Sequence, residues 1–129
     1  MSKGIRLAEI IDEMRRAGKC RFGEELPVEA DRVIETHIEG LDEVAYIFKH
    51  LAEPNKFKIL LLLYINGPLP VCIISHVLNL DQTLTSHHLR SLRKAGLVEY
   101  ERKGKFKFYK LTNTSQKLLD AILTVLEKK

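Results

Sequence analysis

A change of hydrophobic period within residues 81–111 limits what this chain can fold into more than any other feature. Apolar residues recur at helical spacing over 82–95, behind Asp81, whose carboxylate can cap the first turn of a helix. Gly96 then ends the pattern, because the position after a helix often takes a positive φ. Apolar and charged residues alternate over 98–101 and again over 105–108, with Lys103-Gly104 between them. The segment therefore predicts a capped helix followed by a β-hairpin.

Helical patterns fill most of the remaining sequence. We expect further helices over residues 4–17, 28–52, 54–65, 70–78 and 114–128. The second of these is bent at Gly40, and the third is apolar nearly all round, which is typical of a central core helix. Residues 1–27 form an N-terminal arm, a helix plus a connector, and 28–129 form the main domain. The predicted fold is mainly α with a β-hairpin.

A polar-faced helix followed by a basic hairpin is the order of elements in a winged helix-turn-helix, a fold that binds DNA. At about 100° per residue, five hydrogen-bonding side chains share one face of the helix, and these are Gln82, Thr83, Ser86, His87 and Arg90. We expect Thr85 and the apolar residues Leu84, Leu89 and Leu92 on the other side. The hairpin turn adds phosphate-binding cations at Arg102, Lys103 and Lys105. The simpler alternatives are an ordinary solvated helix face and a soluble turn.

The distribution of charge agrees with the DNA-binding interpretation better than the total does. The formal net charge is only +4, but residues 81–110 hold 8 Lys and Arg against 3 Asp and Glu, a net +5. Phosphate contacts need positive charge on these elements, because such contacts supply most non-specific affinity for DNA.

The sequence also indicates a cytoplasmic protein with no membrane partner. The N-terminus is charged and lacks the apolar core of a secretory signal. The longest apolar run, residues 59–65, is far too short to span a bilayer. The two cysteines are then expected to be reduced.

The amphipathic helices at the two ends of the main domain need a partner for their apolar faces. In the helix over 28–52 this face holds Val33 or Ile34, Ile38, Leu41, Val44 or Ala45, Phe48 and Leu51. In the last helix it holds Leu118, Leu119, Ile122, Leu123 and Leu126. A second copy of the chain would cover both, so we expect a homodimer formed through these helices, with packing inside one chain as the alternative.

Four stretches of this sequence, in order, resemble the ArsR/SmtB family of winged-helix repressors. They are LAEPNKFKILLLL (51–63), PVCIISHVL (70–78), LTSHHLRSLRKAGLVEYERKGKFKFYKL (84–111) and the C-terminal helix. The resemblance implies a homodimer that binds a pseudo-palindromic operator in double-stranded DNA and leaves it when an inducer binds. It places Gln82, Thr83, Ser86, His87 and Arg90 at the family's base and phosphate contacts.

The same resemblance implies that the family's metal sites are incomplete here. Members that sense soft metals have a Cys-x-Cys motif at the start of the helix that precedes the DNA-binding helix. In this chain that preceding helix is predicted over 70–78, and the two motif positions hold Pro70 and Cys72. Zinc-sensing members carry Asp and His ligands on the C-terminal helix. The approximate ligand positions here hold Asn113, Ser115 and Leu126, and the helix has no histidine.

A thiol site remains open to three interpretations. Cys72 and His76 are four residues apart on one predicted helix and therefore point the same way, and Cys20 in the arm could join them. Cys72 is a small half-buried apolar residue, or part of a disulfide or redox site, or a soft-metal ligand. We predict no bound cofactor.

The remaining histidines indicate no further site. His87 and His88 diverge by about 100° and cannot chelate one metal; His87 is expected to face DNA and His88 to pack at the core edge. His37 and His50 are expected on the long second helix, in surface or capping roles. No catalytic constellation is apparent, so we predict that the protein is not an enzyme. We predict a sequence-specific DNA-binding transcriptional regulator, a repressor that thiol redox state or a soft metal could control. The alternatives are an architectural DNA-binding protein without an inducer and a winged-helix protein-interaction module.

Overall fold

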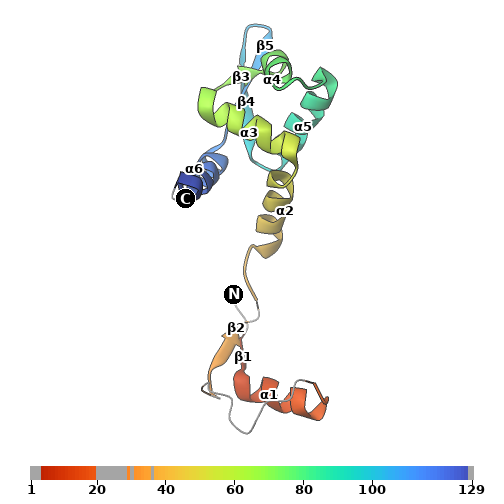
Figure 1. The fold of residues 1–129 in the computed structure, drawn as a ribbon, viewed down its shortest axis with the longest axis vertical. Coiled ribbons are helices and arrows are strands. Elements are labelled where there is room, and N and C mark those ends of the chain that lie inside the picture. Colours follow the sequence, from red (N-terminus) through yellow and green to blue (C-terminus); the bar gives the residue numbers. More distant parts are fainter. Residues whose placement is uncertain (1–3, 20–28, 30, 36, 128–129) are drawn as a thin grey trace. The chain divides into compact units, whose positions relative to one another are not determined.

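The computed structural model describes residues 4–19, 29, 31–35 and 37–127. The chain forms two compact units, residues 1–41 and 42–129 (Figure 1). The predicted arm over 1–27 falls within the first unit, and its separation from the rest at residue 27 stays a prediction.

The first unit consists of two short paired strands and a helix that lies between them in sequence. Strand β1 (Gly4–Arg6) runs antiparallel to β2 (Val33–Glu35), with Ile5 opposite Ile34, and α1 (Leu7–Arg16) lies between them in sequence. The helix predicted over 4–17 is confirmed over Leu7–Arg16, but its start at residue 4 and the helix predicted over 33–35 are wrong. The central pair, Ile5 and Ile34, places two β-branched side chains opposite each other, and such a pair favours a strand over a helix.

The predicted long helix is replaced by a shorter one, α2 (Leu41–Leu51). Gly40 precedes it with φ +77°, which an α-helix cannot accommodate, so Gly40 ends the preceding segment and does not bend a continuous helix. His37 consequently lies outside any helix, contrary to expectation.

Helix α3 (Pro54–Asn66) forms the centre of the second unit, as predicted. The Glu53 carboxylate caps it by accepting hydrogen bonds from the Asn55 and Lys56 N–H groups, at 3.3 and 2.8 Å. Ile59 and Leu60 are completely buried. Ile65, which the apolar pattern included in the core, is exposed near the last turn.

A helix-turn-helix follows. Helix α4 (Val71–Leu78) ends at Asn79, whose left-handed conformation (φ 55°) starts the turn into α5 (Gln82–Lys94). Pro70 lies before α4 and belongs, with Leu69, to the two-residue strand β3. Sequence patterns gave no sign of β3, because so short a strand is recognised only by its partner.

The hairpin forms as predicted, with longer strands and a turn displaced by one residue. Strands β4 (Val98–Lys103) and β5 (Phe106–Leu111) pair with Lys103 opposite Phe106, so the turn is Gly104-Lys105. Strand β3 adds to the other side of β5, and the order of the sheet is β3-β5-β4. In Figure 1 this sheet lies beside α3, α4 and α5.

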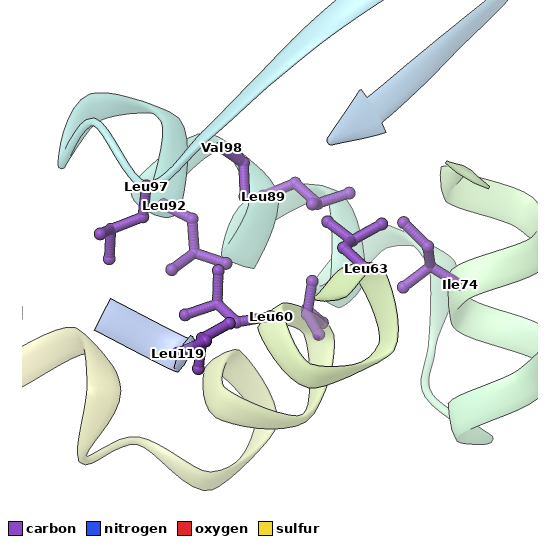
Figure 2. Packing of buried hydrophobic residues seen from close by; sticks show 9 residues of the cluster. Leu60, Leu63, Ile74, Leu89, Leu92, Leu97, Val98 and Leu119 are labelled. Atoms are coloured by element: carbon purple, nitrogen blue, oxygen red, sulfur yellow. The ribbon is translucent and has the colours of Figure 1, made fainter. Parts of the chain in front are cut away.

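One hydrophobic core joins the helices to the hairpin. Its fully buried members are Ile59, Leu60, Leu63, Ile74, Leu89, Leu92, Leu97, Val98 and Leu119 (Figure 2). Leu119 belongs to the last helix, α6 (Asn113–Glu127), and extends toward Leu60 of α3. The expectation that Leu119 faces a second copy is therefore wrong. Of the helices that the structure describes, none is long and apolar enough to cross a membrane.

Candidate nucleic-acid interface

The recognition helix α5 starts from a well-defined cap. The Asp81 side chain accepts a hydrogen bond from the Leu84 N–H at 3.0 Å, and the Thr85 hydroxyl donates to the Asp81 carbonyl at 2.9 Å. Asp81 is thus the N-cap that the sequence predicts. Thr85, Leu89 and Leu92 are completely buried, as expected, whereas Leu84 is 42% exposed and does not join the core.

The five side chains predicted to face DNA lie on accessible sides of α5. Gln82, Thr83, His87 and Arg90 are exposed and Ser86 is half-buried. One Arg90 guanidinium nitrogen lies 3.5 Å from Nδ1 of His87. This places a cation and an imidazole together about one to two turns beyond the start of the helix, and their contact with DNA stays a prediction.

A cleft of about 430 Å³ lies between the start of α4, the recognition helix and the hairpin. Five cationic residues line it, namely Arg90, Arg93, Arg102, Lys105 and Lys107. Gln82 and Ser86 of α5 line it as well, so part of the predicted DNA-facing set turns toward the hairpin. No acidic side chain from the described residues borders the cleft. Such a pocket suits an anion such as a phosphate group.

Aromatic rings hold two of these cations in place. The guanidinium of Arg93 lies 4.5 Å from the centre of the Tyr100 ring, and Nζ of Lys107 lies 4.8 Å from it. Tyr109, whose pKa is raised chiefly by burial, packs against Tyr100 with the ring centres 5.5 Å apart. Sequence reasoning missed Arg93 and Lys107 as members of this site. Arg93 follows Arg90 by one turn, and Lys107 is paired with Arg102 in the hairpin, so their spacing held a usable signal.

The other side of the hairpin carries charges that neutralise one another. Lys110 lies 2.6 Å from the Glu101 carboxylate and 3.8 Å from that of Glu99. The hydrogen bond raises the pKa of Lys110 and lowers the pKa of Glu101. Lys103 also lies away from the cleft, with Nζ 5.2 Å from the centre of the Phe108 ring. The excess positive charge of the hairpin is therefore concentrated on the cleft side and at its tip.

Two histidines lie near the start of α3. His50 is 6% exposed, with Nδ1 3.1 Å from Lys56 Nζ, so the expected surface role is wrong. Burial and then the nearby Lys56 and Lys49 charges lower the pKa of His50. His88 is half-buried, with Nδ1 4.0 Å from the Glu53 carboxylate, as expected for the core edge. Burial opposes ionisation of Glu53, but the Lys56 and Asn55 N–H groups and the charges of His88 and Lys56 outweigh it and lower its pKa.

The structure describes only part of the predicted thiol site. Cys72 is a free, half-buried cysteine that borders the cationic cleft, and His76 is exposed on the same helix. Cys20 lies outside the described residues. Over the part of the chain that the structure describes, no group of three His, Cys, Asp or Glu side chains could hold a metal ion. Ser115, at one of the family's ligand positions, is buried and donates a hydrogen bond to the Leu97 carbonyl at 2.6 Å.

The order of helices α4 and α5 and of the paired strands β4 and β5 defines a winged helix-turn-helix protein, in which the hairpin is the wing. Residues 53–100 match the family model described as "Bacterial regulatory protein, arsR family". The arsenic resistance transcriptional regulator ArsR1 of Pseudomonas putida is 38% identical over 87 residues, which cover 67% of this chain and 68% of that protein. The chain belongs to the arsR family of bacterial regulatory proteins.

Two further proteins show how far the similarity extends. A cadmium resistance regulatory protein CadC homolog of Staphylococcus aureus is 34% identical over 77 residues, and the chain spans 64% of its length. Similarity is also found to the solution structure of a homodimeric winged helix-turn-helix DNA-binding domain from Mycobacterium bovis. The TM-score is 0.61 at 29% identity, covering 71% of this chain and 88% of that one. The family resemblance seen in the sequence and the winged-helix fold are thus confirmed.

Proposed function

We propose that this protein is a DNA-binding repressor of transcription that acts as a homodimer on a pseudo-palindromic operator. The observation that carries the proposal is the cationic cleft between α5 and the wing. A helix with its side chains is about as wide as the major groove, so α5 fits there. The phosphate backbone beside that groove would then lie against Arg93, Arg102 and Lys107.

The two sets of residues have different roles in this proposal. Gln82, Thr83, Ser86, His87 and Arg90 offer hydrogen bonds to base edges and adjacent phosphates. Arg102, Lys103 and Lys105 are at or near the wing tip and contact the backbone. Backbone contacts supply affinity without sequence preference, whereas base contacts supply specificity.

A homodimer is supported by apolar side chains that are exposed on helices α2 and α6. Leu41, Val44 and Phe48 form one stripe of α2, and each is about half exposed or more. On α6, Val125 and Leu126 are exposed as well. The similar domain from Mycobacterium bovis is homodimeric. A dimer with two-fold symmetry presents two recognition helices and so matches a palindromic operator.

The DNA-binding role is tested with the DNA upstream of the protein's own coding region, in a gel shift with random competitor duplex. We expect preferential binding to the upstream DNA. Arg90→Ala should remove about 1–3 kcal/mol of discrimination between the two DNAs, because a base contact is lost. Lys105→Ala should weaken binding to both DNAs alike and reduce the salt dependence by about one phosphate contact. Lys117→Ala, which removes an exposed cation from α6, is the matched control and should change neither.

Each alternative function has its own result in that experiment. Equal affinity for upstream and random DNA would favour a sequence-indifferent architectural protein. Absence of salt-dependent DNA binding would favour a protein-interaction module. A change of base preference in Lys105→Ala, with none in Arg90→Ala, would reverse the roles given to the helix and the wing.

We further propose that the Cys72 thiol controls DNA binding. Cys72 borders the cleft that would hold the phosphate backbone, so a larger or charged sulfur group would interfere with DNA there. The five cations around the cleft disfavour a divalent metal, and a thiol oxidant is preferred for this reason. Peroxide converts the thiol to sulfenic acid with release of water. A second thiol, for which Cys20 is the candidate in the sequence, would form a disulfide with it and release a second water.

The thiol proposal is tested by titrating hydrogen peroxide, zinc and arsenite against the complex with the upstream DNA. Peroxide should weaken DNA binding by wild type and leave Cys72→Ser unaffected. Cys20→Ser separates the two oxidised forms, because a disulfide requires both thiols. A response to zinc or arsenite that Cys72→Ser abolishes would favour the soft-metal interpretation. If none of the three reagents changes the affinity of wild type, Cys72 is a structural residue.

A further inference from the structure

Leu84 is a large apolar side chain exposed in the first turn of the recognition helix. It is 42% exposed, although sequence spacing placed it with Leu89 and Leu92, which are completely buried. Its neighbours Gln82 and Thr83 are polar and exposed. Gln82 and Thr83 can form hydrogen bonds with a base edge, whereas Leu84 can contribute only an apolar contact.

The backbone holds Leu84 in a fixed position. Its N–H donates to the capping carboxylate of Asp81 at 3.0 Å, and Thr85, the next residue, is completely buried and bonded to the Asp81 carbonyl. Helical side chains lean toward the N-terminal end of their helix. This is the end from which recognition helices contact base edges.

The position of Leu84 around the helix separates it from the cationic cleft. At about 100° per residue, it lies about 60° from His87 and about 160° from Gln82, which lines the cleft. The helix thus has hydrogen-bonding groups on the side of the wing and an apolar group at the opposite edge of its exposed surface.

We propose that Leu84 determines sequence specificity by contacting the C5-methyl group of a thymine in the major groove. That methyl is the apolar group that base edges present in the major groove, so a leucine there distinguishes thymine from cytosine and from purines. The contact removes apolar surface of both groups from water. This inference rests on the proposed DNA-binding function and adds a base-specific contact to it.

The experiment compares thymine with 2′-deoxyuridine, which pairs identically and lacks only the methyl group. Duplexes are first selected from a random library with the wild-type protein. Each thymine of the selected duplex is then replaced in turn, and affinity is measured by fluorescence anisotropy. With wild type, we expect one position in each half-site where replacement lowers affinity by about 3- to 5-fold, as for the loss of one buried methyl group.

Variants identify the side chain that detects the methyl group. Leu84→Ala should bind the thymine duplex more weakly and show no further loss with deoxyuridine at that position. Leu84→Met keeps an apolar side chain and should keep the sensitivity. Val77→Ala shortens an exposed apolar residue of α4 and is the matched control, with the sensitivity of wild type.

Two results would overturn the inference while the DNA-binding proposal stands. One is a selected duplex with no deoxyuridine-sensitive position, and the other is sensitivity that persists in Leu84→Ala. Failure of the protein to select any sequence would instead overturn both proposals together.

Discussion

Leu119→Asp should unfold the second unit of the protein. Leu119 is 1% exposed and belongs to the same core as Leu60 of α3 and Leu97 before the wing. Burying an unpaired carboxylate there, in place of a side chain that fills the core, should cost about 4 kcal/mol or more, a large fraction of the stability of an ordinary domain. Thermal unfolding followed by circular dichroism should lose its cooperative transition, or show it at a much lower temperature.

The matched control is Leu126→Asp, which places the same charge on the same helix. Leu126 is 50% exposed in the single chain, so this variant should keep a cooperative unfolding transition, even where the dimer contact proposed for Leu126 is weakened. Similar melting temperatures for Leu119→Asp and wild type would contradict the burial of Leu119.

These two leucines show where sequence patterns stop being informative. Leu119 and Leu126 are seven residues apart, and both lie on the apolar stripe of the last predicted helix. Periodicity shows that a face is apolar but not what covers it. In α6 the first half of that face meets the core and the last turn leaves it, so one stripe has two environments.

Local signals predicted the parts of the fold that are determined within a few residues. Asp81 caps α5 and Gly96 takes φ +76° after it, both as the sequence indicates. Strands that depend on distant partners were missed. Val33–Glu35 forms a strand because it pairs with Gly4–Arg6, and Leu69–Pro70 because it pairs with β5. No local propensity records those pairings.

In the candidate site, too, features determined by local spacing were predicted and features that depend on distant partners were missed. Helical spacing alone placed Gln82 and Arg90 on an accessible side of α5. Arg93 was missed because only the packing of the wing against α5 brings the Tyr100 ring to it. Lys107 was missed because the register of the hairpin, which pairs it with Arg102, places it beside the same ring. Leu84, a hydrophobic residue counted as core, is exposed although the next residue, Thr85, is completely buried, so partner elements cover only one side of the first turn of α5.

Phe48→Asp should convert the proposed dimer into monomers without unfolding the chain. Phe48 is 57% exposed in the single chain and shares a stripe of α2 with Val44 and Leu41. If a second copy covers this stripe, the substitution buries two carboxylates, one from each copy, in a symmetric interface. An uncompensated buried charge costs about 3–5 kcal/mol, so the dimer dissociation constant should rise by at least about 100-fold.

Sedimentation velocity at micromolar concentration measures this change, and circular dichroism checks that the fold is kept. Lys49→Asp is the control, because it introduces the same group at a neighbouring exposed position, about 100° around α2 from Phe48. We expect that variant to remain dimeric. A wild-type chain that sediments as a monomer, or a Phe48→Asp variant that stays dimeric, would show that the α2 stripe is not the interface.

Monomers of Phe48→Asp should also bind a palindromic duplex far more weakly than wild type, because the two recognition helices would no longer be joined. Their affinity for a single half-site should match that of a wild-type monomer, since Phe48 does not line the cationic cleft.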